Sequence, residues 1–304
     1  MLHTVSMNIL KTLDLRQGPV QYSDTGSGEP ILFLHGAMLS ARLWRNIIPK
    51  LERHYRCIAP TLPMGGHTLP MPESADLSPQ GQVQVIMELM DRLQLPEVTV
   101  VANDTGGALA QFLMNRCPER LKKVVLTNCD AFEIFPPRQF QYLVTCMKWP
   151  PFVDLMALNL RIPFARNLPF TLGDMSVKPL EIMDEYLQPL LNQKAIRRDL
   201  RKLFIGIHPR DTQKAAEGLP RFQKPVLVVW GKKDRLFPQE LGRRLAAALP
   251  KSQLIWLENS KTLVPEDQPE LLTELVHLFM EDRPLPSGSV QSGTRSERTY
   301  RRNA

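Results

Sequence analysis

Short apolar runs alternate with helical patterns along this chain, and this alternation limits the possible folds more than any other sequence feature. The runs cover residues 31–34, 57–59, 98–102, 124–127, 226–230 and 254–257. Helical patterns lie between or after them, at about 43–51, 79–93, 107–115, 238–248 and 269–280. Strands that alternate with helices form mostly parallel sheets with flanking helices. We therefore expect an α/β fold with a mostly parallel central sheet, preceded by a hairpin at 13–15 and 20–22.

The alternation stops between residues 131 and 219, where the chain is rich in Pro, Met, Leu and aromatic residues. A helical insertion between two strands predicts a cap over the strand ends, where open α/β sheets bind ligands. A small helical bundle without a ligand role is the alternative. We therefore predict an α/β core over 1–130 and 220–282 and a helical cap over 131–219. The apolar cap residues favour a hydrophobic pocket or the cap's own core, namely Phe135, Phe140, Met147, Trp149, Phe152 and Met156.

The positive charge of the chain is concentrated at its C-terminal end. Residues 283–304 hold five arginines and one glutamate, a net +4 of the total +7. This stretch has almost no apolar residues, so we predict a disordered basic tail. The remaining +3 gives little reason to expect a nucleic-acid partner. No apolar run reaches the ~20 residues of a membrane-spanning helix, so no membrane span is predicted. The four cysteines lack metal-ligand spacing, which favours reduced thiols and a cytoplasmic location.

A strand-like run that leads through a turn into a helix lies at residues 98–110, with the sequence VTVVANDTGGALA. Asp104 occupies the turn, Ala102 precedes it by two residues, and Gly106 and Gly107 follow it. This pattern is typical of a nucleophile elbow, which reads G-x-S-x-G in its serine form. The helix start favours an anion, and a carboxylate there can attack an electrophilic carbon. A simple helix N-cap role for Asp104 is the alternative.

With this turn and two further motifs, the chain resembles the α/β-hydrolase superfamily, specifically its aspartate-nucleophile branch of epoxide hydrolases and haloalkane dehalogenases. The resemblance covers roughly residues 18–280. The other motifs are FLHGA at 33–37 and VWGKKDRLFP at 229–238. The resemblance implies that Asp104 is the nucleophile and Asp234 the supporting acid. It also implies that the backbone N–H groups of Ala37 and Thr105 form an oxyanion hole.

The chain departs from this family at the catalytic histidine, which should follow the last family strand. Our alignment places Thr262 at that position. Threonine cannot act as a general base near neutral pH. We therefore expect the histidine to be replaced, so that an ester formed on Asp104 stays trapped unless another histidine acts. His67 in a glycine-rich loop and His208 in the cap are the candidates.

Other residues are candidates to line the site. Asp130 follows a strand at which some relatives place the acid, although a turn role is equally compatible. The resemblance implies that cap tyrosines hold an epoxide oxygen, and a core role is their alternative. The halide clamp of the dehalogenases is absent, because Thr105 and Ala37 stand at its positions. The candidates for lining the site are therefore His35, His67, Asn103, Asp130, Tyr142, Tyr186, His208 and Thr262.

These features predict a hydrolase that acts on a hydrophobic small molecule such as an epoxide, halide or ester. A lyase or isomerase on the same scaffold, or a binding protein that has lost turnover, is the alternative. No phosphate loop, dinucleotide fingerprint or metal-ligand cluster occurs in the sequence, so we expect no cofactor and no metal. The sequence leaves the oligomeric state open.

Overall fold

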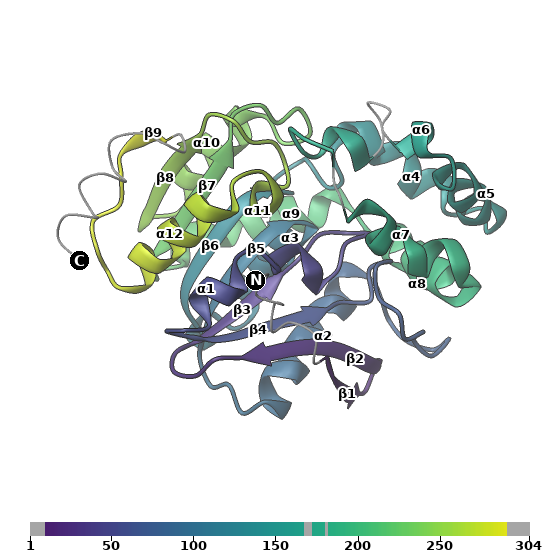
Figure 1. The fold of residues 1–304 in the computed structure, drawn as a ribbon, viewed down its shortest axis with the longest axis horizontal. Coiled ribbons are helices and arrows are strands. Elements are labelled where there is room, and N and C mark those ends of the chain that lie inside the picture. The colour runs from purple at the N-terminus through teal and green to yellow at the C-terminus, as the bar shows by residue number, and fades with distance from the viewer. Residues whose placement is uncertain (1–9, 167–171, 180–181, 291–304) are drawn as a thin grey trace, which may run out of the picture.

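A nine-stranded sheet forms the centre of the computed structural model, which describes residues 10–166, 172–179 and 182–290. The strand order is β1-β2-β4-β3-β5-β6-β7-β8-β9 (Figure 1). β1 and β2 form an antiparallel hairpin, β2 also pairs antiparallel with β4, and every other pair is parallel. The predicted mostly parallel sheet and its leading hairpin are thus confirmed. The strands are β1 (Lys11–Leu15), β2 (Gly18–Thr25), β3 (Pro30–Leu34), β4 (Arg56–Thr61), β5 (Val98–Asp104), β6 (Leu121–Cys129), β7 (Val226–Gly231), β8 (Ser252–Leu257) and β9 (Gly288–Val290).

The helices of the α/β part follow the sequence patterns closely, except near residue 45. There the predicted helix over 43–51 is replaced by a 3-10 turn at Ala41–Trp44 and the short α1, with Pro49 as its second residue. α2 begins as its sequence predicts, because the Ser78 hydroxyl caps the Gly81 N–H and Pro79 occupies the first position. These helices are α1 (Ile48–Leu51), α2 (Pro79–Arg92), α3 (Thr105–Arg116), α10 (Gln239–Ala248), α11 (Val264–Asp267) and α12 (Pro269–Met280).

Between β6 and β7, the described residues form helices and turns and only a single isolated β-bridge. We call residues 131–219 the insertion. Figure 1 shows its helices α4 to α8 gathered at one end of the molecule, away from β9 and the C-terminal end. Its helices are α4 (Gln141–Cys146), α5 (Pro151–Leu160), α6 (Pro163–Arg166), α7 (Met183–Asn192), α8 (Lys194–Gly206) and α9 (Pro209–Gly218).

The stretch predicted as a disordered tail begins with ordered structure. Gly288–Val290 forms β9, which pairs with β8, and the Val290 side chain is buried. Without β9, the strand β8 would be an edge strand with a row of unpaired backbone groups. β9 pairs with part of that row, and the Glu258 N–H donates to the Val290 carbonyl. The prediction of disorder is therefore wrong for these three residues. Residues 283–287 are described outside any helix or strand, and residues 291–304 lie outside the described residues.

Candidate active site

Asp104 stands at the junction of β5 and α3 in a backbone conformation that few residues other than glycine adopt. Its φ is 55° and its ψ is −131°, and such a conformation costs on the order of 1–3 kcal/mol for a side-chain-bearing residue. Close packing accompanies the turn. A Cβ atom on Gly36 would lie 1.9 Å from the Asp104 Oδ2, and one on Gly106 would lie 2.4 Å from the Leu34 carbonyl oxygen. Glycine at both positions lets the carboxylate and α3 approach the end of β3.

The Asp104 side chain lies on a pocket of about 700 Å³ between the sheet and the insertion. Asp104 is 5% exposed. Among the lining residues only Asp104, Thr105 and Tyr142 carry polar side-chain groups. The rest of the lining consists of Ala37, Met38, Pro136, Pro137, Phe140, Leu143, Met156, Leu160, Leu172, Met175, Phe204 and Ile207. A carboxylate in such surroundings loses most of its hydration.

Burial and, next in size, the nearby negative charge of Asp234 together raise the pKa of Asp104 to about 7. The Thr105 N–H donates to the Asp104 carboxylate and opposes this shift. Asp130, buried just after β6, has a pKa raised well above its usual range by burial and by the charge of Asp104. A contact with the Thr105 hydroxyl opposes that shift too. The elbow is therefore surrounded by acids that hold protons to unusually high pH.

Asp234 lies in the loop after β7 and is held by hydrogen bonds on both oxygens. The Thr262 hydroxyl lies 2.9 Å and 3.0 Å from them, the Asn128 amide donates at 2.7 Å, and the Leu236 N–H donates at 2.8 Å. Burial raises the pKa of Asp234 to about 7, although these donors oppose the shift. Thr262 is itself fully buried and does not line the pocket. Asp234 thus interacts with Asp104 through its negative charge and with Thr262 through a hydrogen bond.

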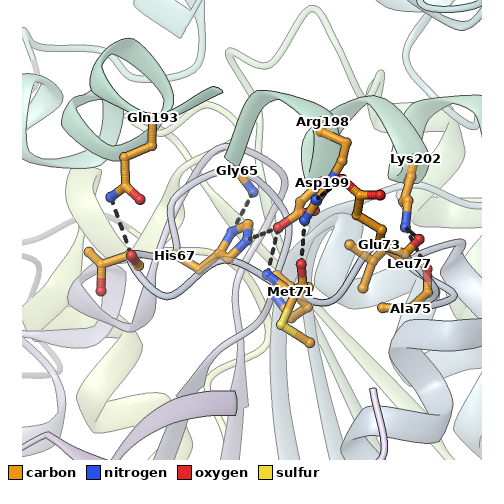
Figure 2. A network of polar contacts seen from close by, with 12 residues as sticks. Gly65, His67, Met71, Glu73, Ala75, Leu77, Gln193, Arg198, Asp199 and Lys202 are labelled. Carbon is orange, nitrogen blue, oxygen red and sulfur yellow. Dashed lines mark hydrogen bonds and ion pairs between the residues drawn. The ribbon is translucent and has the colours of Figure 1, made fainter. Parts of the chain in front are cut away.

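Five histidines fall within the described residues, and none of them lines this pocket. The His35 Nδ1–H donates to the Gly36 carbonyl and its Nε2 accepts from the Leu62 N–H. Burial lowers the pKa of His35 to about 4. His67 accepts from the Gly65 N–H and donates to Asp199 in α8 (Figure 2). His208 lies half-buried at the start of α9. Neither alternative candidate therefore lines the pocket that holds Asp104.

Sequence comparison agrees with this architecture. A model of the alpha/beta hydrolase fold family matches residues 29–268 of the chain, which include the elbow, the insertion and the Asp234 loop. The chain belongs to the α/β-hydrolase fold family. The predicted superfamily and fold class are confirmed.

Relatives within the α/β-hydrolase fold family carry different activities. The cis-3-alkyl-4-alkyloxetan-2-one decarboxylase of Xanthomonas campestris is 26% identical over 293 residues, covering 90% of this chain and 97% of that protein. A haloalkane dehalogenase of Mycobacterium bovis is 27% identical over 268 residues, covering 86% of this chain and 92% of that protein. The epoxide hydrolase CorEH has a similar fold, with a TM-score of 0.75 at 19% identity over 90% of this chain and 99% of that one. The family names indicate a hydrolase-type enzyme and leave the reaction open.

Of the remaining predicted site residues, one lines the pocket and two do not. Tyr142 in α4 lines the pocket, whereas Tyr186 in α7 is fully buried elsewhere and its hydroxyl donates to Glu266. Asn103 points away from the pocket, and its amide donates to the Thr127 hydroxyl and the Thr262 carbonyl. Asn103 therefore ties β5 to the loop that carries Thr262.

Sequence patterns alone missed much of the pocket wall. Of the apolar insertion residues singled out above, only Phe140 and Met156 line the pocket. Trp149 is exposed, whereas Phe135 and Met147 belong to the buried core. Leu172, Met175, Phe204 and Ile207 come from turns and helix ends with no local signal for a ligand wall.

Proposed function

We propose that this α/β hydrolase acts on an uncharged, apolar small molecule and that Asp104 is the residue that attacks it. The observation that carries the proposal is the position of Asp104 as the carboxylate on an otherwise largely apolar pocket. The strained turn presents this side chain, and the insertion supplies most of the opposite wall. In this proposal residues 131–219 form the cap and Asp234 is the supporting acid.

The proposed reaction begins when an Oδ atom of Asp104 attacks an electrophilic substrate carbon. A C–O bond forms, and the bond to the leaving group breaks with its electron pair. With an epoxide, the ring oxygen stays attached to the substrate and takes a proton from solvent. With an epoxide or a halide the product is an alkyl ester of Asp104, and with a carboxylic ester it is a mixed anhydride; water must hydrolyse either one. The N–H groups of Ala37 and Thr105 would stabilise the negative charge that develops during this hydrolysis.

Release of the ester is the slow step in this proposal. A buried water needs a base, and no histidine among the described residues lines the pocket. At the position of the family histidine, the Thr262 hydroxyl donates to the supporting acid Asp234. A hydroxyl group is too weak a base to activate water at neutral pH. We therefore expect the alkyl ester to accumulate.

A second function, non-hydrolytic acid–base conversion in the same pocket, is favoured by the pKa of Asp104. A carboxyl group with a pKa of about 7 can both give and take a proton near neutral pH. The relative named as an oxetanone decarboxylase acts, by its name, on a molecule with two alkyl groups. Such a reaction would need no ester hydrolysis.

Intact-mass spectrometry after incubation with aryl epoxides, alkyl halides and p-nitrophenyl esters tests the proposal. We expect one equivalent of adduct, mapped to Asp104, with a formation rate that rises with pH through about 7 because the ionised carboxylate is the nucleophile. Asp104→Asn should abolish the adduct. Asp14→Asn removes an exposed carboxylate of β1 and should leave it unchanged.

The other outcomes are equally informative. Hydrolysis product without an accumulating adduct contradicts the slow release of the ester, whereas a non-hydrolytic product without an adduct supports acid–base conversion over covalent attack. An adduct that persists in Asp104→Asn, or a lack of both adduct and product, contradicts the role proposed for Asp104.

A further inference from the structure

Large apolar side chains are exposed almost entirely on one part of the insertion. Within the described residues, seven such side chains are exposed, and six of them lie between residues 142 and 164. The exposed fraction reaches 61% for Leu158 and 76% for Phe164. Exposed apolar groups that cluster in this way mark interaction sites, whereas scattered ones do not. We call these six residues the outer patch: Tyr142, Trp149, Leu155, Leu158, Ile162 and Phe164.

Helix α5 shows most clearly that the patch lacks a partner. Its inner face is buried through Val153, Ala157 and Leu160. On its outer face, Leu155 and Leu158 are spaced by three residues and exposed. Apolar residues that gather on the outer as well as the inner face of a helix commonly meet a partner there, although the exposed Asp154 and Asn159 flank them in α5. The outer face of α5 is therefore a candidate to bind a partner, and the described part of the chain does not cover it.

Positive charges without acidic partners border the outer patch. Lys148 precedes Trp149, Arg161 follows α5 directly, and the Arg201 guanidinium donates to the Lys148 carbonyl. Arg161 likewise donates to a backbone carbonyl. None of these three side chains forms an ion pair within the described residues, whereas the exposed acid of α5, Asp154, is already paired with Arg197. The surface thus combines exposed Leu, Ile, Phe and Trp with uncompensated cations.

We propose that the outer patch is a docking surface for an anionic lipid bilayer. Apolar and aromatic side chains would enter the headgroup boundary while the cations meet lipid phosphates and carboxylates. α5 is ten residues long, about 15 Å, so it would lie along the surface. No helix in the described ranges is long and apolar enough to cross a membrane. A second protein copy explains the apolar residues less well, because the same cations would then face each other.

The patch adjoins the pocket. Tyr142 belongs to both, and α5 contributes Met156 and Leu160 to the pocket wall from its other side. Figure 1 shows α4, α5 and α6 together at the outer end of the molecule. Docking would therefore place the pocket's outer wall against the bilayer. The proposal concerns binding alone and is independent of the reaction at Asp104.

Vesicle flotation with the full chain tests the docking surface. We compare phosphatidylcholine vesicles with vesicles that also contain phosphatidylserine, and expect roughly tenfold stronger binding to the anionic ones. Leu158→Ser, Ile162→Ser and Phe164→Ser combined should reduce binding more than about tenfold. Leu10→Ser is the control, because it changes an apolar residue that is 48% exposed but lies just before β1, outside the outer patch. This variant should bind vesicles like the wild type.

Two readouts keep the test decisive. Fluorescence of the exposed Trp149 should shift to the blue on anionic vesicles. Trp149→Phe should abolish most of the shift, because Trp44 and Trp230 are buried and the half-buried Trp256 lies in β8, outside the insertion. The triple variant keeps the arginines of the C-terminal stretch. Unchanged binding by that variant would assign the affinity to those arginines and overturn the proposal. Wild-type self-association without vesicle binding would also overturn it.

Discussion

The contact between Asp234 and Thr262 bears on whether an ester formed on Asp104 can be hydrolysed. Thr262 gives the buried acid a hydrogen bond but supplies no base. Asp104 has a pKa near neutrality without a proton acceptor beside it in the pocket. In the proposed reaction, these single residues favour attack by Asp104 and disfavour release of the ester.

Replacing Thr262 by histidine should supply the missing base. A histidine there can donate its Nδ1–H to Asp234 and leave Nε2 free to activate water. We expect Thr262→His to release the Asp104 adduct about 10²- to 10⁴-fold faster than the wild type, the usual range for general-base catalysis. The measurement is product formed per enzyme, together with the decay of the adduct mass.

Thr262→Val is the matched control, because it keeps the side-chain volume and removes the hydroxyl. It should show no gain in release. Equal adduct lifetimes in folded Thr262→His and wild type would contradict the assignment of residue 262 as the position of the base.

The elbow could be predicted from sequence because its signal is local. Asp104, Gly106 and Gly107 are close in the chain, and their spacing defines the turn. The pairing of Asp234 with Thr262 joins two loops, and an alignment suggested it only indirectly. The separation of Tyr142 from Tyr186 could not be predicted, since a helix pattern does not show which neighbour each face meets.

At the scale of elements, α8 fastens the insertion to the loop after β4. Figure 2 shows Asp199 in the middle of this network. Its carboxylate accepts from the Met71 N–H at 2.8 Å and from His67 at 3.2 Å, and it pairs with Arg198. Lys202 donates to two carbonyls of the same loop, those of Glu73 and Ala75. Burial alone would raise the pKa of Asp199, but the hydrogen bonds from His67, Met71 and Arg198 lower it below its usual value.

Asp199→Ala should loosen this attachment. The substitution leaves a buried histidine and a backbone N–H without their acceptor, which costs about 1–3 kcal/mol for an unsatisfied buried group. We expect a lower denaturant midpoint and faster amide exchange in α8. Glu217→Ala removes an exposed acid of α9 and should change neither measurement. Unaltered exchange in α8 of Asp199→Ala would show that apolar packing alone holds the insertion.

The order and type of the core elements followed from the sequence, because apolar periodicity reflects burial in the sheet. The insertion was harder to predict. Its helices were expected only as a class, since short helices interrupted by proline have weak individual signals. β9 was missed because three residues make a strand only when a free sheet edge is available.

The whole molecule has a stability that depends on its buried acids. Asp104 and Asp234 have folded-state pKa values of about 7, and the pKa of Asp130 is raised further. In the unfolded chain these groups titrate near 3.8. At these three groups the folded state therefore binds more protons between these values. Their contribution to stability is full below about pH 4 and is lost as pH rises through about 7. Asp24 and Asp199, whose pKa values are lowered, favour folding above pH 4 instead.

We therefore expect the unfolding temperature to fall between pH 5 and pH 8. Asp104→Asn, which cannot ionise, should be stabilised by about 2–4 kcal/mol at pH 8 relative to wild type, and by much less at pH 5. Calorimetry or denaturant unfolding at both pH values measures this difference. Parallel pH profiles of the two proteins would mean that Asp104 titrates as an ordinary exposed carboxyl.

The short ninth strand has a practical consequence for anyone who trims the gene. A protein that ends before residue 288 would leave β8 as the border of the sheet, with the Glu258 amide and its neighbours facing solvent. Exposed edge strands with unpaired backbone groups tend to pair with strands of other molecules. Such a shortened product should precipitate or form oligomers in light scattering, whereas one that keeps Val290 should stay dispersed.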